Sequence, residues 1–236
     1  MTIAELSAKY EQYVIEMRRE FHENPELSLH EERTVRRIRE ELDKLGIPNV
    51  TVGHNNVVGT LEGGKPGKKL AIRADIDALP VCEANDVPYK SKVDGVMHAC
   101  GHDGHTAIQL IVAKILSAHR DAFRGQIKFL FQPNEEEAGA LNMINAGVLE
   151  APHVDAALAL HLWSPIKTGR IGLSEGPILG TTEEFELEII GKAGHTATPH
   201  TGRDAILGAC SVVQAMQCLG TREFDPLLPI AVMFGH

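Results

Sequence analysis

Four short apolar runs separated by helical stretches are the feature that most constrains the fold of this chain. The runs cover residues 56–61, 70–74, 127–131 and 156–160, and Gly, Pro or charged residues bound each of them. Segments this short and this apolar are typical of buried β-strands. Between the runs, residues 105–116 and 138–146 have the apolar spacing of helices. Strands that alternate with helices predict an α/β fold with a mostly parallel sheet.

Two amphipathic helices are predicted before the first run. In residues 3–21 apolar side chains recur at spacings of three and four, which predicts one helix that ends before Pro25. A second helix is predicted from about residue 31 to residue 45, where Gly46 and Pro48 supply a stop signal. The apolar spacing gives the first of these helices one apolar face.

The chain changes character near residue 165. Residues 165–180 are rich in Gly and Pro, and in residues 185–189 apolar side chains alternate with glutamates, the pattern of a strand with one solvated face. A helix is predicted over residues 204–219. We therefore expect two domains, with residues 1–178 forming the larger and residues 179–236 a smaller α+β domain.

Composition excludes several classes of function. The chain has 236 residues with 23 Lys+Arg and 32 Asp+Glu, a formal net charge of −9, which argues against nucleic acid or an anionic membrane as the partner. No apolar run approaches the roughly 18 residues of a membrane-spanning helix, and the N-terminus lacks the pattern of a signal peptide. The four cysteines are too sparse for a disulfide framework. These features predict a soluble, cytoplasmic protein.

Histidine is unusually frequent in this chain. The chain has 12 His against 11 aromatic residues (7 Phe, 3 Tyr and 1 Trp), which suggests imidazole as a metal ligand or proton carrier. The densest cluster is MHACGHDGH, in which Cys100 and His102 flank Gly101 closely enough to bind one ion. Taken alone, this pair is a weak signal, because a free cysteine is usually a small buried hydrophobe.

Acidic residues and a further histidine follow the predicted strands. Asp75 and Asp77 lie in RADIDALP, Glu135 and Glu136 in FQPNEEEAGA, and His161 ends AALALH. Taken one at a time, each motif has an ordinary structural explanation. Asp75 and Asp77 fit a turn, the two glutamates fit an acidic loop that caps a helix, and His161 fits a core histidine. Together with the Cys–His pair they would occupy four strand ends along one edge of a sheet, where ligands gather. We therefore predict a metal site in which one glutamate binds the ion and its neighbour transfers protons.

The sequence also offers patterns of other site types. Residues 59–66 have the glycine and lysine spacing of a P-loop, but Pro66 stands where Ser or Thr must bind magnesium. The chain has no G-x-S-x-G motif for a serine hydrolase. Cysteine catalysis by Cys100 with a neighbouring histidine stays an alternative. His195 in GKAGHTATPH is either part of a polar turn or a residue that reaches a metal site from another domain or subunit.

The motifs together resemble one family, the metal-dependent amidohydrolases of the aminoacylase type. This family includes hippurate hydrolase, N-acyl-amino-acid amidohydrolases and the hydrolases of indole-acetyl amino acids. The matching segments occur in the family's order over nearly the whole chain: RREFHENPELSLHEE, RADIDALP, MHACGHDGH, FQPNEEEAGA, HLW and GKAGHTATPH. The resemblance implies a metallopeptidase-like catalytic domain with a smaller dimerisation (lid) domain, both incomplete here.

The resemblance also implies roles for individual residues. Cys100, His102, Glu136 and His161 would be metal ligands, with the Cys100 thiolate in the bridging place. Glu135 would be the general base that takes a proton from a metal-activated water and then protonates the leaving amine. The mixed donor set suits one or two divalent ions, manganese or zinc, with cobalt or nickel as further options.

Two more residues take their roles from the resemblance. Asp77 would orient a ligand, and His195 in the small domain would stabilise an oxyanion in a neighbouring active site. The substrates would be N-acyl amino acids, and the full-length protein would be a homodimer formed through the small domain.

The chain also departs from the family pattern. Asn134 and Glu137 alter the loop around the base, and no residue near His236 matches a late histidine ligand of the family. The resemblance therefore allows a second hypothesis, a truncated and catalytically inactive fragment that binds a metal or pairs with a partner. On this hypothesis residues 1–236 show little or no turnover.

Overall fold

The computed structural model divides the chain into two units. It describes residues 2–181, 183–225, 227–228 and 230–235, so His236 lies outside the described residues. The first unit is Met1–Arg170 and the second is Ile171–His236. This division falls ahead of residue 178, where the sequence predicted a domain boundary.

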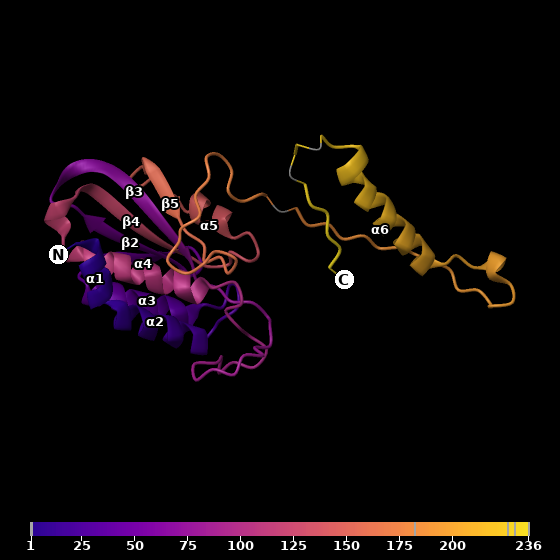
Figure 1. The fold of residues 1–236 in the computed structure, drawn as a ribbon, viewed down its shortest axis with the longest axis horizontal. Coiled ribbons are helices and arrows are strands. Elements are labelled where there is room, and N and C mark those ends of the chain that lie inside the picture. Colours follow the sequence, from indigo (N-terminus) through magenta and orange to yellow (C-terminus); the bar gives the residue numbers. More distant parts are fainter. Residues whose placement is uncertain (1, 182, 226, 229, 236) are drawn as a thin grey trace. The chain divides into compact units, whose positions relative to one another are not determined.

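A five-stranded sheet forms the centre of the first unit (Figure 1). Its strands are β1 (Asn49–Val52), β2 (Asn56–Glu62), β3 (Lys65–Asp75), β4 (Arg124–Gln132) and β5 (Ala156–Ala159), in the spatial order β1-β2-β4-β3-β5. β3 pairs in parallel with β4 and β5, whereas β1 and β2 are added antiparallel at one side. The four predicted runs are β2 to β5, which confirms the α/β prediction. The short β1 was missed because two exposed residues form its middle.

Helices cover both faces of this sheet. The helices of the first unit are α1 (Ile3–Lys9), α2 (Glu11–Glu23), α3 (Glu32–Lys44), α4 (His102–Ser117) and α5 (Ala140–Asn145), of which α1 packs against α2. The single helix predicted over residues 3–21 is divided at Tyr10, whose backbone (φ −108°, ψ 10°) leaves the helical region while the apolar spacing continues past it. Among the described residues, no helix has the length and apolarity needed to cross a bilayer.

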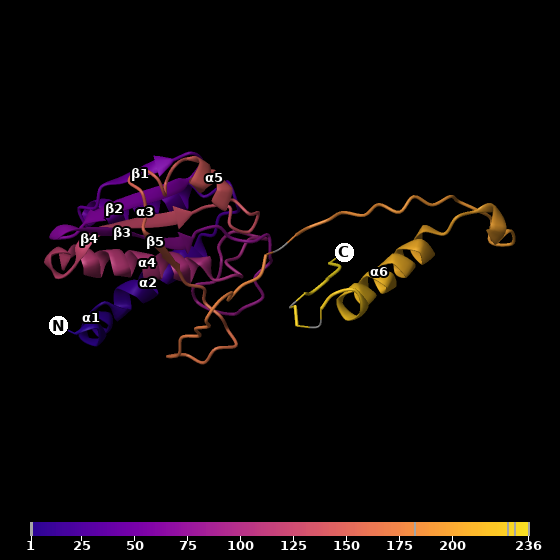
Figure 2. The ribbon, with the colours of Figure 1, turned by 90° about the horizontal axis from the view of Figure 1, so that it is seen from above.

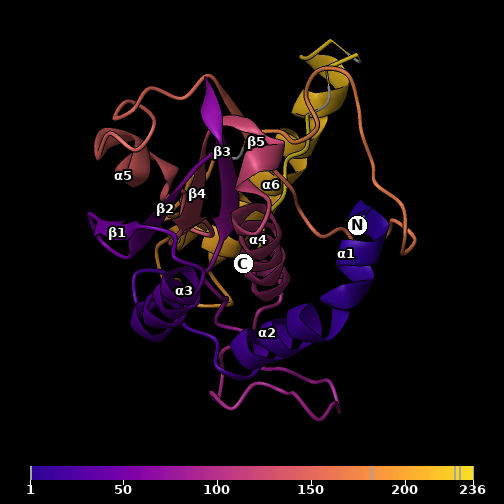
Figure 3. The same ribbon diagram turned by 90° about the vertical axis from the view of Figure 1, so that its left-hand side faces the viewer.

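The two faces of the sheet have separate apolar clusters. Val57 points into the larger one, where strand residues such as Phe129 meet side chains of α2, α3 and α4, including Ile38. Its neighbour Val58 points the other way and packs near Met143 of α5. Figures 2 and 3 show α5 on the opposite side of the sheet from α2 and α4. Each large side chain that is buried here contributes about 1.5–3 kcal/mol to folding.

The second unit contains one long helix, α6 (Ala205–Arg222), as the sequence predicted. The side chain of Asp204 accepts a hydrogen bond from the Leu207 amide (3.0 Å) and caps its first turn. The strand predicted over residues 185–189 is not formed: Phe185 and Leu187 are 55% and 54% exposed. No described segment pairs with it, and a strand without a partner leaves its backbone groups unbonded.

Candidate metal centre

The polar residues singled out in the sequence gather at the carboxyl end of the parallel strands. β3 leads into Asp77, β4 into the acidic loop at residues 135–136, and β5 into His161. Cys100 and His102 do not follow a strand, contrary to the prediction. The segment before them is an irregular loop that ends at the start of α4. Three strand ends and one helix N-terminus therefore build the site.

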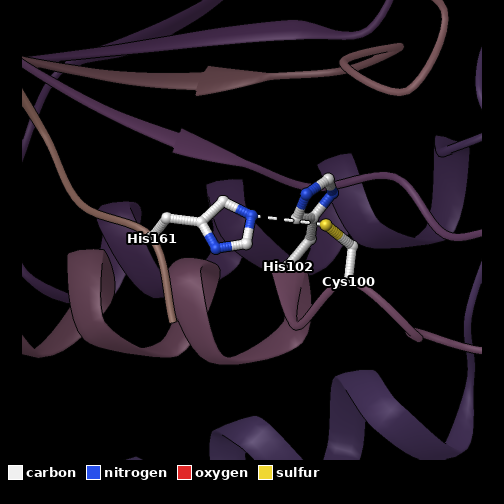
Figure 4. A group of neighbouring side chains, drawn as sticks. All are labelled: Cys100, His102 and His161. Atoms are coloured by element: carbon white, nitrogen blue, oxygen red, sulfur yellow. Dashed lines mark hydrogen bonds between the residues drawn. The ribbon is translucent and has the colours of Figure 1, made fainter. Parts of the chain in front are cut away.

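The donor atoms lie at the separations that a bound metal ion requires. Cys100 Sγ is 3.3 Å from His161 Nε2, and Figure 4 shows this nitrogen pointing at the sulfur. His102 Nε2 is 3.7 Å from Glu135 Oε2 and 3.8 Å from Glu136 Oε1. Donors that share an ion about 2 Å away lie roughly 3 to 4 Å apart. The cluster can therefore hold a metal ion.

Gly101 allows the side chains of Cys100 and His102 to face the same candidate metal site. It precedes the first residue of α4 and has φ +93°, a conformation that L side chains rarely adopt. The backbone thus turns sharply between Cys100 and His102. A side chain at this position would strain the turn and move the two donors apart.

Hydrogen bonds fix the tautomers of both histidines. His102 Nδ1 is 3.0 Å from the backbone oxygen of Asp77 and 3.2 Å from its Oδ1, and His161 Nδ1 is 2.7 Å from the Leu162 carbonyl oxygen. These oxygens accept hydrogen bonds, so each Nδ1 donates. In the neutral ring each Nε2 then presents a lone pair, which is the usual arrangement of a metal-binding histidine.

Two buried polar atoms face each other beyond hydrogen-bond distance, at 3.8 Å. In the part of the chain that the structure describes, His102 Nε2 and Glu136 Oε1 are buried and have no hydrogen-bond partner. Buried polar atoms are almost always paired, because an unpaired one loses its hydration without compensation. A divalent cation would satisfy both atoms, so the donor set fits a metal ion.

The surroundings of Cys100 oppose its ionisation. Burial and the nearby carboxylate of Glu136 raise the pKa of the thiol to about 12. Burial, together with the charges of Asp77 and Glu135, also raises the pKa of Glu136 despite the opposing effect of His102. A nucleophilic cysteine needs a lowered pKa, so the burial and the negative charges around Cys100 disfavour the cysteine-hydrolase alternative. A bound cation would supply the missing positive charge.

Asp77 joins the histidine to the acidic loop. Its carboxylate is fully buried, and Oδ2 accepts hydrogen bonds from Ser28 Oγ (2.8 Å) and the Glu136 amide (3.0 Å). Burial raises the pKa of Asp77, but hydrogen bonds from His102, Glu136 and Ser28 outweigh burial and leave the pKa below its ordinary value. Asp77 is therefore a fixed anion that contacts two elements of the site.

A second pair, Asp75 and His105, supports the loop after β5. His105 Nδ1 is 3.4 Å from Asp75 Oδ2, and its Nε2 accepts a hydrogen bond from the Leu162 amide (3.0 Å). Because Leu162 follows His161, this contact limits where the ligand can move. Asp75, His102 and His105 also bring three potential ligand atoms within 4.8 Å of one another.

His195 belongs to the second unit. Its side chain is exposed, and Nδ1 accepts a hydrogen bond from the Ala197 amide (3.1 Å). The ring proton of the neutral tautomer is therefore on Nε2.

Sequence reasoning missed two residues between α2 and α3 that contact the site. Ser28 binds Asp77, and the carboxylate of Glu31 accepts a hydrogen bond from the Asn134 amide (3.0 Å). Neither residue belongs to a periodic pattern. An acidic residue such as Glu31 is common just before a helix, because negative charge is favourable at a helix N-terminus, so its presence does not indicate a contact with the site.

Comparisons with known proteins place these motifs in context. A sequence profile of peptidase family M20/M25/M40 matches residues 71–234. The chain is 46% identical over 222 residues to an N-acyl-L-amino acid amidohydrolase of Geobacillus stearothermophilus, which covers 93% of this chain and 60% of the relative. It is 41% identical over 220 residues to the IAA-amino acid hydrolase ILR1-like 4 of Arabidopsis thaliana, which covers 91% and 49%.

A solved structure is also similar to this chain. The chain resembles the YXEP protein of Bacillus subtilis, described as a dinuclear metal-binding peptidase of the M20 family, with a TM-score of 0.69 and 42% identity. The match covers 72% of this chain and 48% of that chain. The chain thus spans less than two thirds of the length of these relatives.

Proposed function

Because the chain belongs to peptidase family M20/M25/M40, we propose that the protein hydrolyses the amide bond of N-acyl amino acids with the help of bound divalent metal. The products are a carboxylic acid and an amino acid. The names of the similar amidohydrolases support this substrate class. The observation that carries the proposal is the facing pair of buried, unpaired acceptors, His102 Nε2 and Glu136 Oε1.

Four side chains of the cluster would hold the metal. They are Cys100, His102, Glu136 and His161, and the ion would be manganese or zinc. When bound, a divalent ion lowers the pKa of a coordinated water and polarises the acyl carbonyl. Asp77 keeps His102 in the tautomer that presents Nε2.

Glu135 is the residue that would move the proton. Its side chain is 35% exposed, so substrate and water can reach it, and its Oε2 lies beside His102 Nε2. Arg73 Nη2 is 3.7 Å from Oε1 and restrains the other side of the carboxylate. Glu135 accepts a proton from the attacking water and returns it to the leaving amine nitrogen.

The role proposed for the second part of the chain is assembly. Residues 179–236 would belong to a dimerisation (lid) domain, beside the catalytic metal-binding domain of residues 1–178. His195 of one protomer would then donate a hydrogen bond from Nε2 to the oxyanion that develops in a partner protomer's site.

A substrate panel tests the proposal. Purified protein with its metal quantified is assayed on acetyl, benzoyl and indole-acetyl amino acids, before and after chelation. We expect chelation to abolish hydrolysis and manganese or zinc to restore it. Hydrolysis that is indifferent to chelators would favour cysteine catalysis by Cys100. Metal binding without any turnover would support the interpretation of residues 1–236 as an inactive metal-binding or dimerising fragment.

A further inference from the structure

Glu31 is a wholly buried carboxylate far from the site in sequence. Its Oε1 accepts hydrogen bonds from the amides of Leu29 and Asn134 (both 3.0 Å), and its Oε2 accepts one from Asn55 Nδ2 (3.0 Å). Among the described residues no lysine, arginine or histidine lies in salt-bridge contact with it. Every hydrogen-bond donor to its carboxylate among these residues is an N–H group.

One of those N–H groups opens the acidic loop. Asn134 immediately precedes Glu135 and has φ +54°, a left-handed conformation that asparagine tolerates better than most residues. Its carbonyl accepts a hydrogen bond from the Gly139 amide (2.7 Å). A Cβ on Gly139 would lie 2.6 Å from that same oxygen, so the loop closes tightly on Asn134.

Two carboxylates thus hold the backbone of this loop at alternate amides. Glu31 holds the amide of Asn134, and Asp77 holds the amide of Glu136 (3.0 Å). Glu135 lies between these two anchors. The directions of its side chain and of the Glu136 side chain therefore depend on both anchors.

We propose that Glu31 is a positioning residue of the metal centre, which sets the directions of Glu135 and Glu136 through the Asn134 amide. The inference rests on the proposed function, because it assigns Glu31 to the same metal site. Without an acceptor at residue 31, the Asn134 amide is unpaired in a buried place, and the left-handed residue loses the contact that holds it. The loop then relaxes and the metal loses a well-placed ligand.

The chain offers a matched control in Glu26. Its carboxylate also accepts two backbone hydrogen bonds, from the amides of Arg33 (3.0 Å) and Thr34 (2.7 Å). These amides belong to the first turn of α3 and not to the acidic loop. Losing the Glu26 carboxylate should therefore cost stability without disturbing the metal ligands.

The test measures cobalt(II) binding by absorption in the wild type and in the variants Glu31→Met, Glu31→Gln and Glu26→Met. Methionine keeps the length of the side chain but accepts no strong hydrogen bond. We expect E31M to weaken cobalt binding roughly tenfold or more and to change the d–d spectrum. E26M should bind within about twofold of the wild type, although both variants melt at lower temperature.

The glutamine variant adds a rescue. Its carbonyl oxygen can accept from the Leu29 and Asn134 amides, while its NH₂ group faces Asn55, whose own amide can turn to accept. E31Q should therefore recover most of the cobalt affinity. Equal cobalt affinity and spectra in E31M and the wild type would overturn the proposal.

Hydrogen exchange keeps the test decisive if E31M does not fold. In the wild type the Asn134 amide should exchange slowly, because it is buried and bonded to Glu31. Exchange at the rate of an exposed loop would overturn the proposal. If the wild type binds no cobalt, the proposed metal centre is wrong and this inference falls with it. If the wild type binds but E31M binds equally well, only the role of Glu31 is wrong.

Discussion

Two polar clusters, each with buried members, lie on either side of the start of α4. His102 faces the metal centre, whereas the next residue, Asp103, faces α2, because successive helix residues point about 100° apart. Asp103 Oδ2 is 2.7 Å from His22 Nδ1 and 2.9 Å from Arg18 Nε, and His22 Nε2 is 3.0 Å from Glu83 Oε1. We call these four residues the Asp103 cluster.

The two clusters differ in how their polar atoms are satisfied. In the Asp103 cluster each carboxylate has a cationic or N–H partner. Both ring nitrogens of His22 face carboxylate oxygens, so a protonated His22 donates to both, and the charges of the two acids then balance those of Arg18 and the imidazolium. In the metal centre two acceptors, His102 Nε2 and Glu136 Oε1, face each other at 3.8 Å unpaired. A buried network that satisfies itself serves the fold, whereas a network that needs a cation to be complete indicates a ligand site.

The largest predicted effect concerns the function of the metal centre. In protein that hydrolyses an N-acyl amino acid, Glu135→Gln should lower kcat by roughly 10²- to 10⁴-fold, because the amide cannot accept the proton of water. Bound metal, measured by elemental analysis, should stay at the wild-type level. Glu137→Gln is the control, since Glu137 is exposed in the same loop. Full activity in E135Q would remove Glu135 from the mechanism.

The Asp103 cluster should respond in stability and not in metal binding. His22→Ala removes the partner of two buried carboxylates and should lower the free energy of unfolding by about 3 kcal/mol, measured by denaturant melting. The exposed His30 provides the control, and His30→Ala should change little. Cobalt spectra of H22A should match those of the wild type. A changed spectrum would show that the two clusters are not separate.

Metal addition tests the same difference between the two clusters through thermal stability. An ion that binds the folded state stabilises it by about 2.7 kcal/mol at a free concentration of 100 times Kd. We expect zinc or manganese to raise Tm in the wild type and in H22A. The gain should vanish in His102→Ala, which lacks the donor shared by the candidate ligand groups. A Tm gain that survives in H102A would place the ion elsewhere.

The sequence predicts those parts of the site that depend on local pattern. Asp77, the acidic loop and His161 follow apolar strands, and parallel strands bring such ends together. Cys100 and His102 are only two positions apart in sequence, so their proximity needs only a tight turn at Gly101. The Glu31 contact joins residues 103 apart. No local pattern predicts such a contact, because the contact depends on how the segment before α3 folds back onto the sheet.

The strand predicted over residues 185–189 failed for a related reason. Alternation of apolar and acidic residues describes the two faces of a strand, but a strand also needs a neighbour to bond its backbone. The runs that became β2, β3 and β4 have neighbours on both sides. Pattern therefore predicts a strand well only where the rest of the sheet is present.

The smallest predicted effect is the pH dependence of the Asp103 cluster. Hydrogen bonds to Asp103 and Glu83 outweigh burial and the charge of Arg18, so they raise the pKa of His22 above its ordinary value of 6.5. The folded state then holds the proton more tightly than the unfolded state, and the stabilisation is complete below pH 6.5 and is lost as pH rises through the folded-state pKa.

The difference in unfolding free energy between the wild type and His22→Gln should therefore be larger at pH 6 than at pH 9, measured by denaturant melting of metal-free protein. The same comparison with His30→Gln is the control for the loss of an exposed imidazole. If the wild-type advantage over H22Q grew with pH, His22 would be neutral in the folded state, and the charge balance that separates this cluster from the metal centre would be wrong.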